Sequence, residues 1–162
     1  FDVTVLWYNP NLYPEAEYDK RLSTQKQLID AIAQDGVHTK LLVEPWRSED
    51  YFSRIKGLEN EPEEGKRCLE CFRIRLDETA RIAAERGFDW FCTTLTLSSR
   101  KDAVAVNAIG REVEKKYDVR WLPSEFKKRE GNHRSIILSE KYGLYRQEYC
   151  GCVFSLNGGS NE

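Results

Sequence analysis

The sequence has no run of apolar residues that approaches the roughly 18 needed for a membrane-spanning helix, and it contains no Met. It also lacks a basic leader with a small-residue cleavage site, and residues 1–6 have the pattern of a strand instead, so we expect no secretory signal. No glycine-rich phosphate loop is present, which argues against a Rossmann cofactor site or a P-loop. The histidines, His38 and His133, are isolated, and neither is a candidate catalytic base.

The sequence also lacks a strong net charge of either sign. It has 25 Lys and Arg residues and 27 Asp and Glu residues, for a net charge of −2. This balance neither indicates nor excludes a nucleic-acid partner, because such a partner requires only a local basic patch. With 32% charged residues, we expect a well-solvated surface rather than a membrane-bound one. The candidate patch comprises Lys127, Lys128, Arg129, Arg134 and Arg146, and the alternative is that these residues form an ordinary solvated face.

Apolar periodicity and turn residues predict strands alternating with helices. The expected strands span residues 1–8, 39–43, 90–96 and 119–122, and the expected helices span 14–36, 48–57, 68–86, 101–117 and 133–142. Alternation of this kind predicts an α/β fold with a mainly parallel sheet and helices on both faces. The loops after the strands would then converge at one sheet edge, where the chemistry of such folds is found. We expect one domain over residues 1–155 and a disordered tail over 156–162.

Four of the five cysteines form two close pairs, Cys68 with Cys71 and Cys150 with Cys152. An odd count without a secretory signal argues against a disulfide framework and favours a reducing, cytoplasmic location. At the start of a helix, the i, i+3 spacing of the first pair places both sulfurs on one face, where they could hold a metal ion or a cluster corner. The helix N-terminus and the adjacent basic residues would also favour thiolates. Cys92 lies in an expected strand, where it is more typical of an inert core residue.

The spacing of the pairs leaves several interpretations open. The thiols could be free, they could hold a structural zinc ion, or they could hold an iron–sulfur cluster. A thioredoxin-like role is disfavoured because the sequence around the first pair lacks the context of that motif. The glycine between Cys150 and Cys152 would let a loop bring their sulfurs together. A zinc-stapled α/β domain that binds RNA or protein without catalysis is therefore the alternative to an enzyme.

Five segments, two of which contain the cysteine pairs, occur in a distinctive order. They are Tyr8-Asn9-Pro10-Asn11, Gly65-Lys66-Arg67-Cys68-Leu69-Glu70-Cys71-Phe72, Thr93-Thr94-Leu95-Thr96, Leu122-Pro123-Ser124-Glu125-Phe126-Lys127-Lys128 and Gly143-Leu144-Tyr145-Arg146-Gln147-Glu148-Tyr149-Cys150-Gly151-Cys152. Together they resemble the QueH-type epoxyqueuosine reductases, which are cobalamin-independent, and the resemblance extends to about residue 155. The paired cysteines at these positions are specific, whereas a lone CxxC would be a weak signal.

The resemblance implies an oxidoreductase that converts epoxyqueuosine to queuosine at the wobble base of tRNA, the last step of queuosine biosynthesis. It implies a fold similar to nucleotide-hydrolase-like (HUP) sandwiches and a 4Fe–4S cluster, with an additional iron or zinc ion as a further candidate. By position, Cys68 and Cys71 would be cluster and metal ligands, and Cys150 with Cys152 a redox-active pair. Family members carry a strand and a Cys-Cys loop before the segment that begins here, so we expect this chain to be a version that lacks them.

Removal of the epoxide oxygen as water requires two electrons, protons and a group that polarises the oxygen. A dithiol that closes to a disulfide supplies two electrons, a cluster relays single ones, and an iron ion could act as a Lewis acid. Alternatively, Cys150 and Cys152 ligate the cluster or a second metal themselves. The candidate proton donors are Glu148 and Glu125, which stand where the family usually has aspartates.

The resemblance also implies tRNA and an electron donor as partners, with no membrane. Basic side chains would contact phosphates, and an aromatic ring would stack on the wobble base. The candidate substrate or RNA residues are Tyr8, Asn9, Asn11, Lys127, Lys128, Arg134, Arg146 and Gln147, with Tyr145 and Tyr149 as further stacking candidates.

Overall fold

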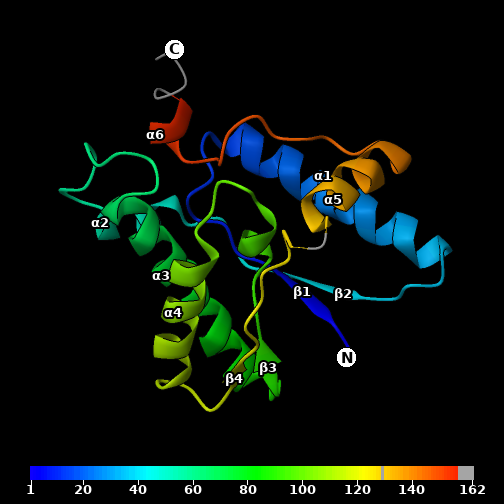
Figure 1. Ribbon diagram of the computed structural model, residues 1–162, viewed down its shortest axis with the longest axis horizontal. Coiled ribbons are helices and arrows are strands. Elements are labelled where there is room, and N and C mark those ends of the chain that lie inside the picture. The colour runs from blue at the N-terminus through cyan, green and yellow to red at the C-terminus, as the bar shows by residue number, and fades with distance from the viewer. Residues whose placement is uncertain (129, 157–162) are drawn as a thin grey trace. The chain divides into compact units, whose positions relative to one another are not determined.

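A computed structural model of the protein describes residues 1–128 and 130–156. Helices alternate with short strands along this chain (Figure 1), which confirms the predicted α/β class. Arg129 lies outside the described residues. Of the tail expected to be disordered, only Leu156 is described. Within the described part, no helix combines the length and the apolar character that crossing a membrane requires.

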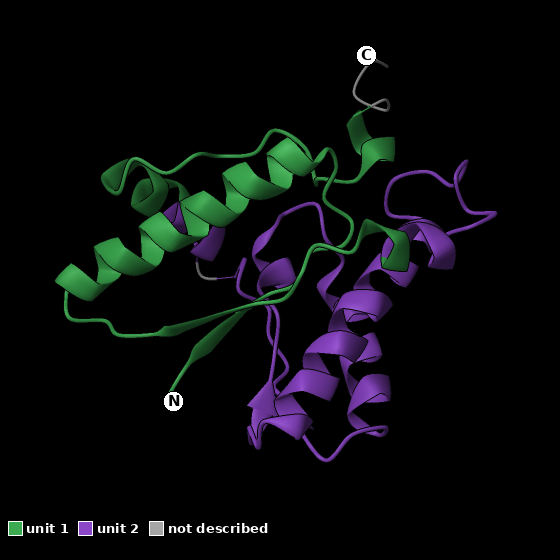
Figure 2. Cartoon of the chain, turned by 180° about the vertical axis from the view of Figure 1, so that it is seen from behind, with its two compact units in different colours: residues 1–50, 136–162 green, residues 51–135 purple. Residues whose placement is uncertain are grey.

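The chain divides into two compact units (Figure 2). Unit 1 comprises Phe1–Asp50 and Ile136–Glu162, and unit 2 comprises Tyr51–Ser135. The chain passes from unit 1 to unit 2 within helix α2 (Ser48–Arg54) and returns within helix α5 (Gly131–Lys141). The single domain expected over residues 1–155 stays a prediction.

Unit 1 is built on a parallel pair of strands joined by a long helix. Strand β1 (Thr4–Trp7) pairs with β2 (Lys40–Val43) in a register that joins Thr4 to Lys40 and Trp7 to Val43, and α1 (Glu15–Gln34) forms the crossover. Because proline fixes φ and lacks an N–H, Pro14 is suited to the position just before α1. The core of this unit contains Trp7, Leu12 and Tyr18, with the rings of Trp7 and Tyr18 in an edge-to-face contact at 5.8 Å.

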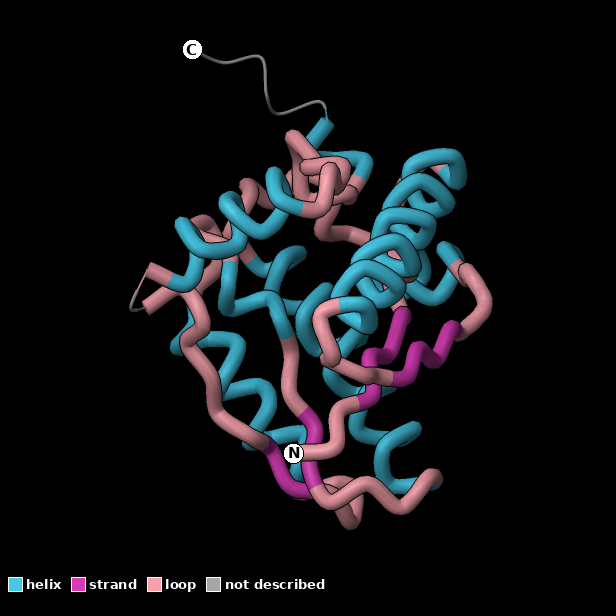
Figure 3. The backbone as a smooth tube through the Cα atoms, turned by 90° about the vertical axis from the view of Figure 1, so that its right-hand side faces the viewer, coloured by secondary structure: helices cyan, strands magenta, loops and turns pink. Residues whose placement is uncertain are grey.

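Unit 2 repeats this plan with shorter strands (Figure 3). Helix α3 (Lys66–Glu85) leads to β3 (Trp90–Phe91), and α4 (Ala103–Glu114) leads to β4 (Arg120–Trp121), which pairs in parallel with β3. Helices α3 and α4 pack side by side through a hydrophobic core (Figure 1). That core contains Phe72, Leu76, Ala80, Ala83, Phe91, Val106, Ile109, Val113, Val119 and Trp121.

The strand expected over residues 90–96 is wrong beyond Phe91. The chain instead forms a short 3-10 helix, η1 (Thr94–Leu97), and the hydroxyl of Thr93 accepts a hydrogen bond from the Leu95 N–H at 3.3 Å. This side-chain cap offers the backbone an alternative to strand pairing. Thr96 is fully buried as a result, and its hydroxyl lies 3.0 Å from the hydroxyl of Ser124.

Gly110 in α4 sets how closely this helix approaches Trp121. A Cβ atom at Gly110 would lie 2.3 Å from Cε2 of the buried Trp121 ring. We expect Gly110→Ala to lower the free energy of unfolding by about 1–3 kcal/mol, because overpacking displaces the ring. Thermal or urea unfolding measures this change, with Val104→Ala on the exposed side of α4 as the matched control. Unchanged stability of Gly110→Ala would contradict this packing.

Candidate functional site

The first cysteine pair lies in the first two turns of α3. A carboxylate oxygen of Glu61 accepts the Lys66 N–H at 3.1 Å and thereby caps the start of this helix. Glu64, with φ of 70°, turns the chain so that its N–H donates to the sulfur of Cys68 at 3.3 Å. Cys68 and Cys71 are both partly exposed. The structure thus confirms that the two residues lie three positions apart at the start of one helix.

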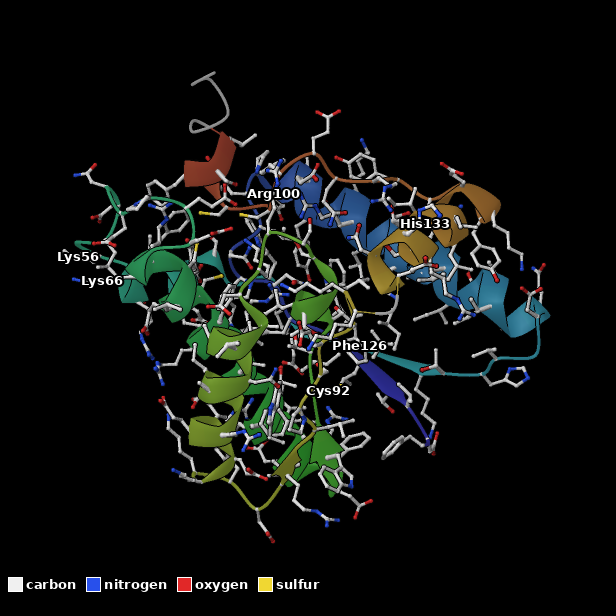
Figure 4. The ribbon with its side chains drawn as sticks, in the orientation of Figure 1. Lys56, Lys66, Cys92, Arg100, Phe126 and His133 are labelled. Carbon is white, nitrogen blue, oxygen red and sulfur yellow. The ribbon has the colours of Figure 1, made fainter. Side chains whose placement is uncertain are left out.

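The two basic residues beside this pair differ in burial and in their contacts. Arg67 is buried, with 4% of its surface exposed, and its guanidinium donates to the carbonyl oxygens of Leu58 at 3.4 Å, Glu59 at 2.9 Å, and Glu61. Arg67 therefore holds the acidic loop before α3. The Lys66 side chain is exposed and points away from the helix (Figure 4).

The residues around the first cysteine pair supply only part of the ligands that a cluster or metal ion requires. Cys68 and Cys71 can supply two thiolates from one helix face, and the Glu64 N–H supplies a hydrogen bond to one sulfur, as is common around iron–sulfur clusters. Among residues 1–128 and 130–156, no three His, Cys, Asp or Glu side chains are grouped to hold a metal ion. The donors present fit two protein positions of a 4Fe–4S cluster, which takes about four.

The second cysteine pair lies on a turn that requires glycine. Gly151 has φ of +104°, and a Cβ atom there would lie 2.1 Å from Cδ2 of Leu12. Cys152 is buried, and the Cys150 sulfur lies 3.1 Å from the Ser155 hydroxyl oxygen. That hydroxyl also lies 2.8 Å from the Cys152 carbonyl oxygen, to which it can donate, so Ser155 contacts both residues of the pair. The sequence analysis missed Ser155, whose only signal is its place three residues after Cys152.

The same turn is tied to the segment that precedes α1. The Tyr13 N–H donates to the Gly151 carbonyl at 2.8 Å, and the Tyr149 hydroxyl donates to the Tyr13 carbonyl at 2.7 Å. Burial raises the pKa of the Tyr149 phenol, with the nearby carboxylate of Glu17 acting in the same direction. The phenol therefore stays neutral and remains a donor over a wider pH range.

The two candidate proton donors lie in different units. Glu148 is exposed in unit 1, two residues before Cys150. Glu125 is partly buried in unit 2, where its carboxylate forms an ion pair with Lys128 at 2.6 Å. The exposure of Glu148 gives a ligand direct access to its carboxylate.

The Tyr8-Asn9-Pro10-Asn11 segment follows β1 and is mostly buried. Tyr8 is 7% exposed, and its hydroxyl donates to the Asp50 carboxylate at 3.4 Å. Asn9 is partly exposed. Asn11 is 4% exposed, and its side-chain carbonyl oxygen has no hydrogen-bond partner among the described residues. Asn11 therefore has an unused acceptor in this segment.

The basic candidates in unit 2 differ in their availability. Lys127 donates to the Lys101 carbonyl at 2.9 Å, whereas 71% of the Lys128 side chain is exposed even though it pairs with Glu125. Arg134 is exposed. Lys128 and Arg134 therefore present charge to solvent, while Lys127 also fixes its own loop.

The basic and amide candidates before the second cysteine pair lie in unit 1. Arg146 is exposed and its guanidinium donates to the Ser139 hydroxyl at 3.1 Å, and Gln147 is exposed. Both side chains can reach solvent.

Cys92 is not the core residue that the sequence predicted, because its strand ends one residue earlier and leaves it exposed (Figure 4). Surrounding protein atoms nevertheless raise the pKa of its thiol by desolvation. Cys92 is therefore held as a thiol rather than as a reactive thiolate.

Comparison with known proteins supports one family over the whole described chain. Residues 1–158 match the family model "Epoxyqueuosine reductase QueH". Proteins named epoxyqueuosine reductase QueH are 41% identical over 155 residues in Streptococcus pyogenes, 40% over 157 in Staphylococcus aureus and 36% over 155 in Thermotoga maritima. These matches cover 95%, 95% and 96% of this chain, and 61%, 65% and 80% of the respective relatives. The chain thus spans less than two thirds of the Streptococcus and Staphylococcus relatives. On the match to residues 1–158 and these identities, the chain belongs to the QueH family of epoxyqueuosine reductases.

Proposed function

We propose that this protein is an epoxyqueuosine reductase that acts on the wobble base of tRNA and produces queuosine. The observation that carries the proposal is the pair of cysteine motifs, one at the start of α3 and one on the Gly151 turn, within a chain that matches the family over residues 1–158. The relatives bear the name of this activity. No observation favours a zinc-stapled binding domain.

The dithiol of Cys150 and Cys152 is suited to supply the electrons. In the proposed reaction, both thiols lose a proton and an electron and their sulfurs join in a disulfide. The two C–O bonds of the epoxide break, a C=C bond forms, and the oxygen leaves as water with the two protons. Electrons and atoms balance without a further reductant in this step, and an external thiol or other donor then restores the dithiol.

Proton delivery to the leaving oxygen falls to a carboxyl group or to the thiols themselves. Glu148 is exposed and lies two residues from Cys150, so its carboxyl is accessible to a bound nucleoside. Glu125 would have to exchange its ion pair with Lys128 for a contact with the substrate. We therefore place Glu148 first and Glu125 second in this role.

A 4Fe–4S cluster is the cofactor we propose, with Cys68 and Cys71 as two of its ligands. When bound, such a cluster supplies single-electron transfer. The capped start of α3 holds both thiols on one turn, and the Glu64 N–H donates to the Cys68 sulfur. Arg67 keeps the loop that carries Glu64 in place through its bonds to three carbonyls. An additional iron or zinc ion remains part of the proposal without assigned ligands.

We also propose that the strand–helix alternation belongs to a sandwich similar to the nucleotide-hydrolase-like folds. The parallel pairs β1–β2 and β3–β4, each connected through helices, support this topology. The five cysteines, all among the described residues, form no disulfide, which together with a tRNA substrate supports a cytoplasmic location as part of the proposal.

The substrate's phosphates are expected to contact the basic residues of unit 2. Lys127→Gln with Lys128→Gln should weaken tRNA binding and lower the salt slope by about 1–2, because each phosphate contact releases roughly one counterion. Binding titrations at several salt concentrations measure this slope. Lys116→Gln is the matched control, since Lys116 is a lysine of the same unit that pairs with Asp77. An unchanged slope in the double variant would place the RNA surface elsewhere.

The direct test of the function is an anaerobic turnover assay. The protein is incubated with tRNA that carries epoxyqueuosine and a chemical reductant, and the nucleosides are then separated and identified by mass. Conversion to queuosine is the expected result. A protein loaded with iron and sulfide that binds the tRNA but leaves the epoxide intact would refute the proposal.

A further inference from the structure

The helix α1 carries an arginine that the sequence did not single out. Arg21 lies at i+4 from Glu17, a spacing typical of exposed helix pairs. In the structure only 10% of the Arg21 side chain and 12% of the Glu17 side chain are exposed, and Nε of Arg21 donates to Glu17 at 2.7 Å. A charged pair that is this buried needs further partners to offset its lost hydration.

The remaining nitrogens of Arg21 supply those partners at the second cysteine pair. One terminal nitrogen donates to the Tyr149 carbonyl at 3.0 Å and the other to the Cys150 carbonyl at 3.2 Å. The guanidinium carbon lies 5.0 Å from the centre of the Tyr149 ring. One rigid, planar group thus binds the last two carbonyls before Gly151.

Glu17 joins a second residue of the same segment to this arrangement. The Tyr145 hydroxyl donates to its carboxylate at 3.1 Å. Burial raises the pKa of the Tyr145 phenol, and the hydrogen bond to Glu17 acts in the same direction, so the phenol remains a donor. The segment over residues 143–152 consequently runs along α1 (Figure 1), with Glu17 and Arg21 as its attachment points.

We propose that Arg21, oriented by Glu17, is a positioning residue for the Cys150–Cys152 dithiol. By fixing the carbonyls of Tyr149 and Cys150, it holds the backbone on one side of Gly151, while the Tyr13 N–H holds the Gly151 carbonyl. The distance between the Cys150 and Cys152 thiols is therefore restricted to a narrow range. The inference rests on the proposed redox role of this pair, and it adds the residue that holds the pair in position.

Arg21→Gln tests this in the 162-residue chain purified under anaerobic conditions. Glutamine cannot form the three charged hydrogen bonds, so the turn should open more often and the buried Cys152 thiol should be alkylated about tenfold faster. The fraction of Cys150–Cys152 disulfide at a fixed glutathione ratio should also fall, with an equilibrium constant lowered about fivefold, because a mobile turn lowers the effective concentration of one thiol for the other. Peptide mass spectrometry after alkylation reports both quantities residue by residue.

Three controls separate positioning from general destabilisation. Arg81→Gln removes an arginine that forms i, i+3 and i, i+4 ion pairs on α3, and it should leave Cys150 and Cys152 unchanged. Arg21→Lys keeps the charge but cannot reach Glu17 and both carbonyls together, so it should resemble Arg21→Gln. The alkylation rate of Cys92 in unit 2 should stay at its parental value in every variant, and a change there would report an effect beyond the Gly151 turn.

If Cys152 in a folded Arg21→Gln variant is alkylated at the parental rate, the inference is overturned. A parental alkylation rate in Arg21→Lys would show that the positive charge alone positions the turn and that the three hydrogen bonds of the guanidinium are not required. If the parent chain forms no disulfide at any glutathione ratio, the redox role under the proposed function fails, while the alkylation comparison still decides the role of Arg21. Neither measurement requires epoxyqueuosine.

Discussion

Replacing Cys68 or Cys71 with alanine is expected to abolish the loading of iron and sulfide. The two residues lie three positions apart at the start of α3, so the loss of either one leaves a single thiolate there. Among residues 1–128 and 130–156, no three potential ligands are grouped, so the described chain holds no ready ligand set that could replace this pair. Iron and acid-labile sulfide, measured on anaerobically reconstituted protein, should fall to background in both variants.

Cys92→Ala is the matched control for this experiment. Cys92 belongs to the same unit, its thiol pKa is raised by desolvation, and it lies outside the opening turn of α3. Its replacement should leave the iron and sulfide content unchanged. Parental iron content in Cys68→Ala or Cys71→Ala would show that the ligands have been assigned wrongly.

The second large effect is expected at the Gly151 turn. Cys150→Ser and Cys152→Ser should each lower epoxyqueuosine turnover at least a hundredfold, since a single thiol cannot close to a disulfide and supply two electrons. Serine keeps the size of the side chain and the hydrogen bond at Ser155, so the turn itself should persist. Turnover is measured under single-turnover conditions without added reductant, with tRNA affinity measured in parallel.

The iron content of these two variants distinguishes the proposed role from its alternative. If Cys150 and Cys152 form a redox pair, both serine variants keep the parental iron and lose the reaction. If iron is lost together with activity, the thiols are ligands and the dithiol mechanism is wrong. Parental turnover in either variant would exclude both roles for that cysteine.

Local sequence signals predicted most of the secondary structure because they act over a few residues. Pro14 and Gly36 correctly bounded α1, and Pro123 correctly followed β4. The failure over residues 90–96 has a local cause, the cap that Thr93 forms on η1, and a tertiary one. Thr96 is fully buried and bonded to Ser124, and that contact with a residue 28 positions away has no signature in the local pattern.

The sequence by itself determined the α/β class, the two cysteine pairs and the family, because periodicity, spacing and motif order are properties of the chain alone. Only the tertiary structure decided which carbonyl groups the arginines near those pairs contact. Arg67, adjacent to Cys68, binds the carbonyls of an acidic loop, whereas Arg21, more than a hundred residues before Cys150, holds the Gly151 turn. The reason is that a guanidinium goes to whichever carbonyls the folded backbone leaves unpaired within its reach, and those are set by packing rather than by distance along the sequence.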